Sequence, residues 1–234
     1  MKVLELDKVS FAYEGEEELI KEISFSLDKN EFLSIVGSSG CGKSTIIKII
    51  GGIEKQKSGK IKSLKTAYMP QKDLLLPWRT VIGNILLPIE LNKKSIKEGR
   101  KKGKFYLKKL HLDEYADKLP QDLSGGMRQR VSFIRTLLTE ADILLLDEPF
   151  SALDAITKGK LQKWLLETLE EFNKSVIFIT HDINEALYLS DRILVCQNRP
   201  LDSFVEYKLP KEKDEKFIIE TKKKILLNIG GEEE

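Results

Sequence analysis

The sequence feature that most restricts the fold is a glycine-rich turn at residues 37–44. It fits the pattern Gly, any four residues, Gly-Lys and then Ser or Thr. The apolar run Phe32–Val36 precedes it, and a helix is predicted over Ser44–Ile50. Glycines in this pattern let the backbone curl until successive N–H groups point at phosphate oxygens, and the helix N-terminus reinforces them. The pattern therefore predicts a phosphate-binding loop between a buried strand and a helix.

Within this loop the residue types suit a nucleotide that carries Mg²⁺. Lys43 is expected to pair with the β- and γ-phosphates, and the Ser44 hydroxyl to bind the metal. Cys41 is interpreted as a small residue at a variable position, because no His-Asn partner set supports a nucleophilic cysteine. The predicted ATP-binding loop residues are Gly37, Ser38, Ser39, Gly40, Cys41, Gly42, Lys43, Ser44 and Thr45.

Two acids follow a second apolar run, Ile143–Leu146. At the end of a buried strand, Asp147 is predicted to hold Mg²⁺ and Glu148 to act as general base towards the attacking water. His181 follows the apolar strand Val176–Thr180, at another carboxyl end where ligands bind in open α/β sheets. A functional role is therefore predicted for His181, whereas His111 is expected at the surface.

Apolar strands alternate with helices along the chain, which predicts an α/β fold with a mainly parallel sheet. Short strands are expected between residues 2 and 36, and one or two more between 59 and 71. Residues 72–140 are expected to be helical, with breaks at Pro77, Pro88 and Pro120. A helix at about 155–172 and a strand at Arg192–Cys196 complete the expected core.

Composition excludes several other classes of protein. Lys and Arg number 39 against 37 Asp and Glu, so the net charge of +2 gives no case for nucleic-acid binding by bulk charge. The apolar runs fall far short of the roughly 18 residues that cross a bilayer, and residues 1–7 lack the apolar block of a signal peptide. Two cysteines and two histidines make neither a disulfide framework nor a four-ligand zinc site. A soluble intracellular protein is expected.

The segment Leu123–Arg130, together with the phosphate loop, resembles the signature of ABC-transporter ATPases. The resemblance covers nearly the whole chain and implies a P-loop NTPase core with a mainly parallel sheet, a small antiparallel β-subdomain and an inserted α-helical subdomain. It implies one ABC ATPase domain over residues 1–202, with the helical subdomain at about 72–140, followed by a C-terminal strand and helix at 203–234. It also implies that Tyr13 stacks on the adenine, that Gln71 lies at the metal and the attacking water, and that His181 is the switch histidine. The implied signature residues are Ser124, Gly125, Gly126 and Met127, and the implied D-loop residues are Ser151, Ala152, Leu153 and Asp154.

Four segments narrow the resemblance to the importer branch for nitrate, sulfonates, taurine and thiamine precursors. They are residues 75–81, 123–130, 154–157 and 180–187. One departure lies between Gly59 and Gln71, where the chain is shorter than is usual in that branch. A trimmed β-hairpin is expected there, which leaves the size of the second sheet open.

This resemblance implies an ATP-hydrolysing motor subunit with Mg²⁺, on the cytoplasmic face of the cell membrane through permease subunits. A solute-binding protein would be an indirect partner, and a second copy would form an ATP-sandwich dimer with the signature acting in trans. No nucleic-acid partner is expected. An exporter or lipid-extractor ATPase and a non-transport soluble ABC ATPase remain as alternatives.

Two further segments have two interpretations each. Residues 74–78, with a Trp just after Gln71, are expected to form part of a groove for a permease helix, and the alternative is that Trp78 enters the core. The basic run from Lys93 to Lys109 is expected to be the solvated face of a helix, and the alternative is an anionic-lipid or nucleic-acid surface.

Overall fold

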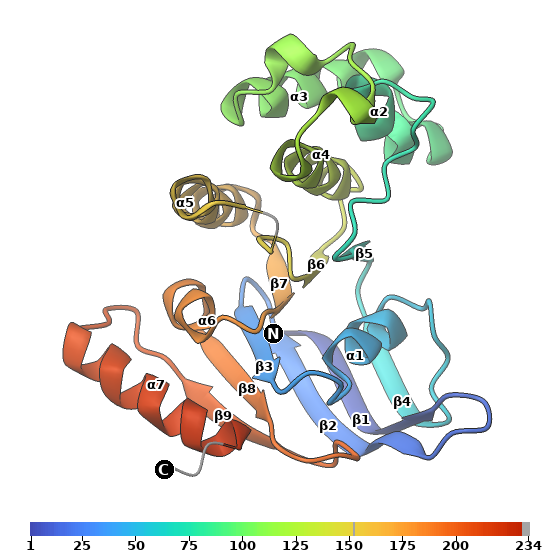
Figure 1. The fold of residues 1–234 in the computed structure, drawn as a ribbon. Coiled ribbons are helices and arrows are strands. Elements are labelled where there is room, and N and C mark those ends of the chain that lie inside the picture. The colour runs from blue at the N-terminus through green and yellow to red at the C-terminus, as the bar shows by residue number, and fades with distance from the viewer. Residues whose placement is uncertain (152, 231–234) are drawn as a thin grey trace.

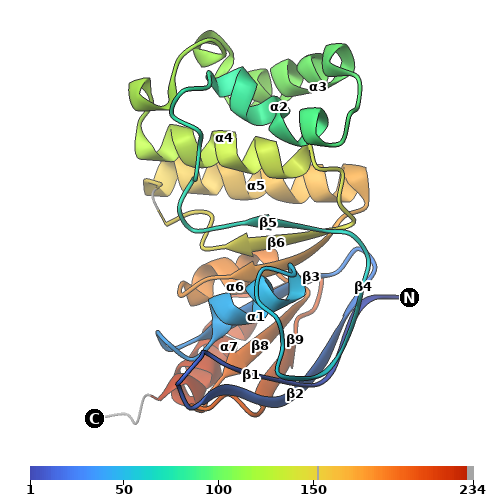
Figure 2. The same cartoon turned by 90° about the vertical axis from the view of Figure 1, so that its right-hand side faces the viewer.

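A six-stranded sheet runs through the middle of the molecule, with a three-stranded sheet on one side and a group of helices on the other (Figures 1 and 2). The computed structural model describes residues 1–151 and 153–230, so Ala152 and residues 231–234 lie outside the described part. In chain order the elements are β1 (Lys2–Ala12), β2 (Glu18–Asp28), β3 (Phe32–Gly37), α1 (Lys43–Ile50), β4 (Ser58–Ser63), β5 (Thr66–Met69), α2 (Val81–Leu91), α3 (Ile96–Lys109), α4 (Gly125–Leu137), β6 (Ile143–Asp147), α5 (Ala155–Phe172), β7 (Ser175–Ile179), α6 (Ile183–Leu189), β8 (Arg192–Cys196), β9 (Phe204–Lys208) and α7 (Glu215–Ile229), with short 3₁₀ turns at Asp113–Tyr115 and Pro120–Asp122.

The larger sheet has the strand order β5-β6-β7-β3-β8-β9, in which β9 alone among the described strands runs antiparallel to its neighbour. Its central strands are buried on both faces, as apolar runs in parallel sheets are. In β6, Leu144 and Leu146 face the helical side, whereas Ile143 and Leu145 face α1 and the smaller sheet. The expected mainly parallel α/β fold is confirmed.

The smaller sheet has the order β2-β1-β4 and is antiparallel. The expectation of short strands in this part of the chain is wrong, because β1 and β2 each extend over 11 residues. β1 continues past Lys8, whose φ of +47° marks an irregularity in the pairing with β2. The Lys8 N–H donates to Ser24 Oγ at 2.9 Å, so the extra residue is accommodated without ending the strand.

The helical region also differs from expectation at two places. Residues 72–80 form a loop and not a helix, with Leu74 at a φ of +44°. Pro88 lies inside α2 and does not break it. Leu86 and Ile89 on either side of Pro88 are buried, and this packing offsets the missing backbone hydrogen bond.

Helix starts follow from local capping. Thr80, Ser95, Ser124, Asp154, Asp182 and Asp214 each accept a backbone N–H in the first turn of the helix that follows. The basic run lies on α3, largely exposed as expected, and His111 is exposed as well. No helix among the described residues is both long enough and apolar enough to cross a membrane. The domain boundary expected at residue 202 stays a prediction.

Candidate nucleotide-binding site

The glycine-rich turn connects the end of β3 to the start of α1. Gly40 has a φ of +79° and Gly42 one of +104°, a left-handed region that side chains disfavour. Gly42 is the N-cap of α1 and has no side chain to accept the first N–H groups of the helix. These N–H groups are therefore available to an anion, which the helix dipole also favours.

Lys43 is buried at 8% exposure although it is a lysine. Its ammonium donates to two carbonyl oxygens of the loop, Gly37 O at 2.9 Å and Ser38 O at 2.7 Å. The loop thus folds around a positive charge that carbonyl dipoles hold in place. Phosphate oxygens, which carry a full negative charge, are stronger acceptors for the same ammonium.

Asp147, the last residue of β6, is buried and accepts two hydroxyl groups. Ser44 Oγ donates to Asp147 Oδ1 at 3.0 Å, and the Tyr68 hydroxyl donates to Asp147 Oδ2 at 3.2 Å. Burial raises the pKa of Asp147, since a charged carboxylate is disfavoured away from water. A hydroxyl beside a buried carboxylate is a hard-oxygen pair of the kind that Mg²⁺ takes.

Glu148 is held by its backbone as well as by its side chain. Its φ is +46°, and its N–H donates to Ile179 O at 2.9 Å across the end of β7. Its two carboxylate oxygens face two of the predicted site residues. Gln71 Nε2 donates to Glu148 Oε2 at 2.9 Å, and His181 Nδ1 lies 3.4 Å from Glu148 Oε1. The structure therefore brings together three residues from distant parts of the chain.

These groups surround one cavity of about 430 Å³. Leu19, on β2, lines it although sequence reasoning did not select it, and its Cγ lies against Gly42. A leucine in an alternating strand carries no signal of such a role. The lining residues are Leu19, Gly37, Ser39, Gly40, Gly42, Lys43, Ser44, Thr45, Gln71, Glu148 and His181.

Tyr13 lies beside this cavity without being one of its lining residues. Its hydroxyl is 3.2 Å from Thr45 Oγ1, and its ring packs edge-on against Phe11 with centroids 4.8 Å apart. Tyr13 is thus fixed against the first turn of α1. Stacking of an adenine on its ring stays a prediction.

The signature residues lie elsewhere. Ser124 caps α4 by accepting the Met127 N–H, and none of residues 124–127 is among the residues that line the cavity. Of the D-loop, Asp154 caps α5, and Ser151 Oγ donates to Glu148 O at 3.0 Å. Ala152 falls outside the described residues.

Gln129 is a residue that sequence reasoning missed. It is buried on α4, and its amide donates to Glu148 O at 3.2 Å. It therefore links the signature helix to the backbone of the predicted base. A glutamine inside an amphipathic helix gives no sequence signal for this contact.

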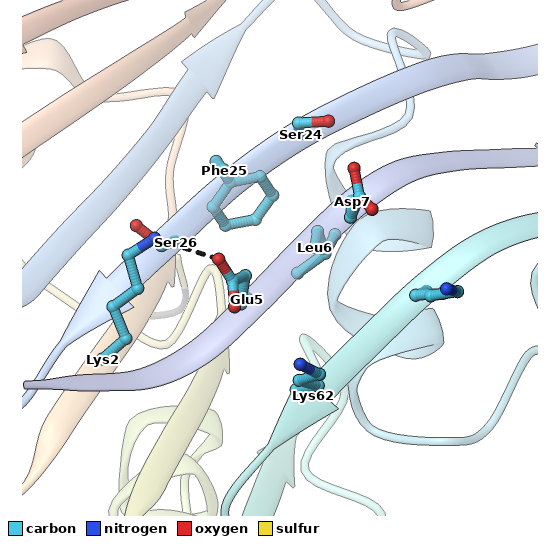
Figure 3. Close-up of a pocket in the computed structure, with 9 residues that line it drawn as sticks. Lys2, Glu5, Leu6, Asp7, Ser24, Phe25, Ser26 and Lys62 are labelled. Carbon is cyan, nitrogen blue, oxygen red and sulfur yellow. Dashed lines mark hydrogen bonds and ion pairs between the residues drawn. The ribbon is translucent and has the colours of Figure 1, made fainter.

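Another cavity, of about 490 Å³, lies on the outer face of the smaller sheet (Figure 3). Phe25 and charges of both signs line it, and Lys2 and Glu5 pair with each other at 3.0 Å. Its charged residues are Lys2, Lys60 and Lys62 against Glu5 and Asp7, and among the lining residues only Lys2 and Glu5 form an ion pair within 4 Å. Within the described part of the chain, no cluster of three or more His, Cys, Asp or Glu side chains is arranged to hold a metal ion.

Comparison with known proteins shows what this chain is similar to. A family model described as ABC transporter matches residues 20–151. The formylaminopyrimidine import ATP-binding protein ThiZ of Halalkalibacterium halodurans is 41% identical, over 89% of this chain and 85% of that protein. The aliphatic sulfonates import ATP-binding protein SsuB of Bacillus cereus is 38% identical, over 97% of this chain and 94% of that protein.

Solved structures agree with this result. The dimeric structure of MJ0796, a bacterial ABC transporter cassette, superposes with a TM-score of 0.81 at 32% identity, covering 89% of this chain and all of that one. A post-hydrolysis dimer of the same cassette, bound to ADP and Pi, gives the same values.

Proposed function

This chain belongs to the ABC transporter family as an ATP-binding, ATP-hydrolysing importer subunit, and we propose that it drives uptake of a small solute of the sulfonate or thiamine-precursor kind. We assign the catalytic roles from one observation: Glu148 contacts both Gln71 and His181 beside the phosphate loop that contains Lys43. Each of these residues lies at or just beyond the end of a strand or in the loop, so one cavity holds the phosphate-binding and the proton-accepting groups.

Hydrolysis begins with the nucleotide phosphates in the loop. The Lys43 ammonium leaves the Gly37 and Ser38 carbonyls and pairs with phosphate oxygens, because the latter carry more charge. Glu148 accepts the proton of the attacking water while Gln71 and His181 hold its carboxylate in position. The left-handed backbone at Glu148 aims this carboxylate into the cavity.

We assign the Mg²⁺ site to Ser44 and Asp147, with Gln71 nearby. The hydroxyl and the buried carboxylate are 3.0 Å apart, and burial raises the pKa of Asp147, so a bound cation would stabilise its charged form. Mg²⁺ takes few protein ligands and completes its shell with water and substrate phosphates. The absence of a three-residue cluster among the described side chains fits this mode of binding. When bound, the ion neutralises charge on the β- and γ-phosphates.

The position of the signature supports a dimer. Residues 124–127 are not among the described residues that line the cavity of their own chain. The N-terminus of α4 nevertheless offers Gly125 and Gly126 N–H groups, which suit a phosphate. We therefore propose that Ser124 and Gly126 of one protomer close over the γ-phosphate that Lys43 of its partner holds.

Within residues 74–78, Leu74 and Trp78 supply an exposed surface for the permease, whereas Leu75 is buried in the core. Trp78 is 73% exposed, so the alternative that it enters the core is wrong. The loop is nevertheless rigidly held, because the buried Asn84 amide accepts from Leu76 N–H and donates to the Leu76, Arg79 and Thr80 carbonyls. A large indole that is exposed to water on a hydrogen-bonded loop is typical of a surface that contacts another protein. Docking to a permease would keep the subunit at the cytoplasmic face of the membrane, with a solute-binding protein as indirect partner.

The dimer is tested with the Glu148→Gln chain, in which ATP is bound but not consumed. With ATP it should elute from gel filtration as a dimer, and a further Ser124→Arg substitution should return it to monomer. In a mixed dimer of a Lys43→Ala chain and a Ser124→Arg chain, one site combines both altered residues and the other site combines the two unaltered ones. A mixture of the two chains should therefore regain ATPase activity that neither chain shows alone. A dimer that persists in the Glu148→Gln, Ser124→Arg chain would refute the trans arrangement.

The permease contact is tested with Trp78→Ala. The isolated subunit should keep its melting temperature and its ATP affinity, because the indole buries little in this chain. Solute uptake by the assembled transporter should be lost. Leu91→Ala is a matched control, since Leu91 is 75% exposed on α2 outside the loop. Unfolding of the Trp78→Ala subunit would contradict the assignment.

A further inference from the structure

The two cysteines of the chain both adjoin Gly37 at the start of the phosphate loop. Cys41 belongs to the loop, and Cys196, the last residue of β8, pairs in register with Gly37 at the end of β3. Both are buried, at 3% and 1% exposure. A Cβ placed on Gly37 would lie 2.8 Å from Cys196 Cβ and 3.2 Å from Cys41 Sγ, so both cysteines adjoin the same position and only glycine leaves them room.

The surroundings make the two sulfurs chemically different. Lys43 Nζ lies 3.8 Å from Cys41 Sγ. The adjoining Cys196 side chain, which has the largest effect, and Lys43 both lower the pKa of Cys41, to about 6. The adjacent Cys41 thiolate and burial raise the pKa of Cys196. Cys41 is thus the more acidic of the two thiols and Cys196 the less acidic, the arrangement of a reactive and a resolving cysteine.

We propose that Cys41 and Cys196 form a reversible disulfide in the presence of hydrogen peroxide, and that this bond closes the phosphate loop to ATP. The effect on ATP, but not the bond itself, rests on the function proposed for the loop. The contact of two cysteines with one glycine position and with Lys43 supplies the geometry.

The chemistry takes two steps. The Cys41 thiolate attacks one oxygen of peroxide, the O–O bond breaks, and Cys41 becomes a sulfenic acid while the hydroxide released takes up a proton to become water. The Cys196 sulfur then attacks the Cys41 sulfur, an S–S bond forms, and the S–O bond breaks. The hydroxide that leaves takes the Cys196 proton and becomes the second water. Two thiols are oxidised by two electrons and one peroxide is reduced.

The bond must alter the loop because a disulfide is shorter than a contact between two thiols. An S–S bond of about 2.05 Å draws the sulfurs together. Since Cys196 is fixed in β8, the movement falls on Cys41, whose neighbours Gly40 and Gly42 have left-handed backbones that tolerate it. Residue 41 lies among the residues whose N–H groups face the phosphates, so the phosphate loop loses the conformation that binds them.

ATP should in turn protect the pair. When phosphates engage Lys43, its ammonium, 3.8 Å from Cys41 Sγ in the free loop, stabilises the Cys41 thiolate less. The thiolate fraction of Cys41, and with it the reactivity of Cys41, then falls. The bound nucleotide also covers the loop, which lines the cavity at Gly40, Gly42 and Lys43.

The experiment treats the reduced full chain with hydrogen peroxide, with and without Mg-ATP, and digests it under non-reducing conditions for mass spectrometry. A linked peptide pair containing Cys41 and Cys196 should appear without ATP and be depleted with it. Affinity for a fluorescent ATP analogue should fall at least about tenfold, the loss of one hydrogen bond to a charged group. Dithiothreitol should restore both the free thiols and the affinity.

Cys196→Ser and Cys196→Ala are the matched controls, because each keeps Cys41 and the loop. Both should bind the analogue like the wild type before oxidation. Neither should lose and regain affinity as fully as the wild type, because Cys196 is both the resolving thiol and the residue that most lowers the pKa of Cys41. The proposal is overturned if no linked peptide forms, if it forms without a loss of affinity, or if the variants lose and regain affinity as fully as the wild type. A reduced chain that never binds the analogue would instead refute the function of the loop, while the linked peptide would still report on the bond.

Discussion

The carboxyl edge of the large sheet and the helical region around α2 and α3 are held together by different kinds of contact. At the sheet edge, Glu148 directly follows β6 and His181 lies two residues beyond the end of β7, and backbone pairing fixes where both strands end. In the helical region, a Cβ on Gly99 would lie 3.0 Å from Ile89 side-chain atoms, and one on Gly103 would lie 3.0 Å from Ile82 Cδ1. Backbone hydrogen bonds therefore position the chemistry, and close side-chain packing positions the region that carries the signature.

One segment connects these two regions. The loop that begins at Gln71 is attached to α4, since Arg135 donates to Asp73 O at 2.7 Å and to Leu74 O at 2.8 Å. Arg128 Nε also pairs with Asp73 Oδ2 at 3.0 Å. Gln71 at one end of the loop contacts the predicted base, and Trp78 at the other end is exposed. Movement of the helical region relative to the sheet would therefore displace Gln71.

The largest expected effect is on the ATPase rate, and it is tested with one Glu→Gln substitution at the sheet edge and one in the helical region. Glu148→Gln should lower kcat by about 10²–10⁴-fold, because an amide cannot accept the proton of the attacking water. ATP affinity and melting temperature should stay unchanged. Glu140→Gln, the same chemical change beyond the end of α4, should leave kcat unaffected. Steady-state ATPase rates measure both, and a Glu148→Gln chain with more than half the wild-type rate would place the base elsewhere.

The same difference explains what the sequence could predict. The range Ile143–Asp147 was expected as a strand and is one, because an uninterrupted apolar run has few alternatives to a buried parallel strand. The loop at residues 37–44 likewise lies between β3 and α1 as expected. Both are local patterns that the parallel sheet places at one edge.

The helical region was less predictable because its form depends on partners distant in the sequence. The continuation of α2 through Pro88 relies on the burial of Leu86 and Ile89. The ordered loop before α2 relies on Asn84, whose amide satisfies carbonyls that a helix would otherwise have satisfied. In the site itself, the Gln129 contact with Glu148 O depends on how α4 packs against the sheet, which no sequence pattern reveals.

An intermediate effect is expected from overpacking the contact between α2 and α3. Gly103→Leu should destabilise the chain by about 1–3 kcal/mol, because its side chain must displace Ile82 and Ile85. Gly103→Ala should be close to neutral, since only the flexible ends of those side chains need to yield and alanine favours the helix. Urea unfolding gives the stabilities, and a fluorescent analogue should show unchanged ATP affinity in both variants. A folded Leu variant without ATP binding would show that the two regions are not separable.

The smallest effect concerns charge at the end of α4. Glu140 pairs with Lys102 at 2.6 Å and also with Lys94, and these contacts, chiefly the hydrogen bond from Lys102, lower the pKa of Glu140 from 4.5 to about 2. A lowered folded-state pKa adds stability above the unfolded value of 4.5, and this stability is lost as the pH falls towards 2. Since the side chains are partly exposed, Glu140→Gln should cost less than about 1 kcal/mol at pH 7. The deficit of the variant in free energy of unfolding, measured by urea unfolding, should shrink between pH 4.5 and 3. It should also shrink in 1 M salt, because the Debye length there is only about 3 Å and the ion pairs are screened.

The control is Glu114→Gln, which alters an exposed carboxylate of the same region and should show no such deficit. A deficit as large at pH 3 as at pH 7 would mean that Glu140 stabilises the region by packing and not by its charge.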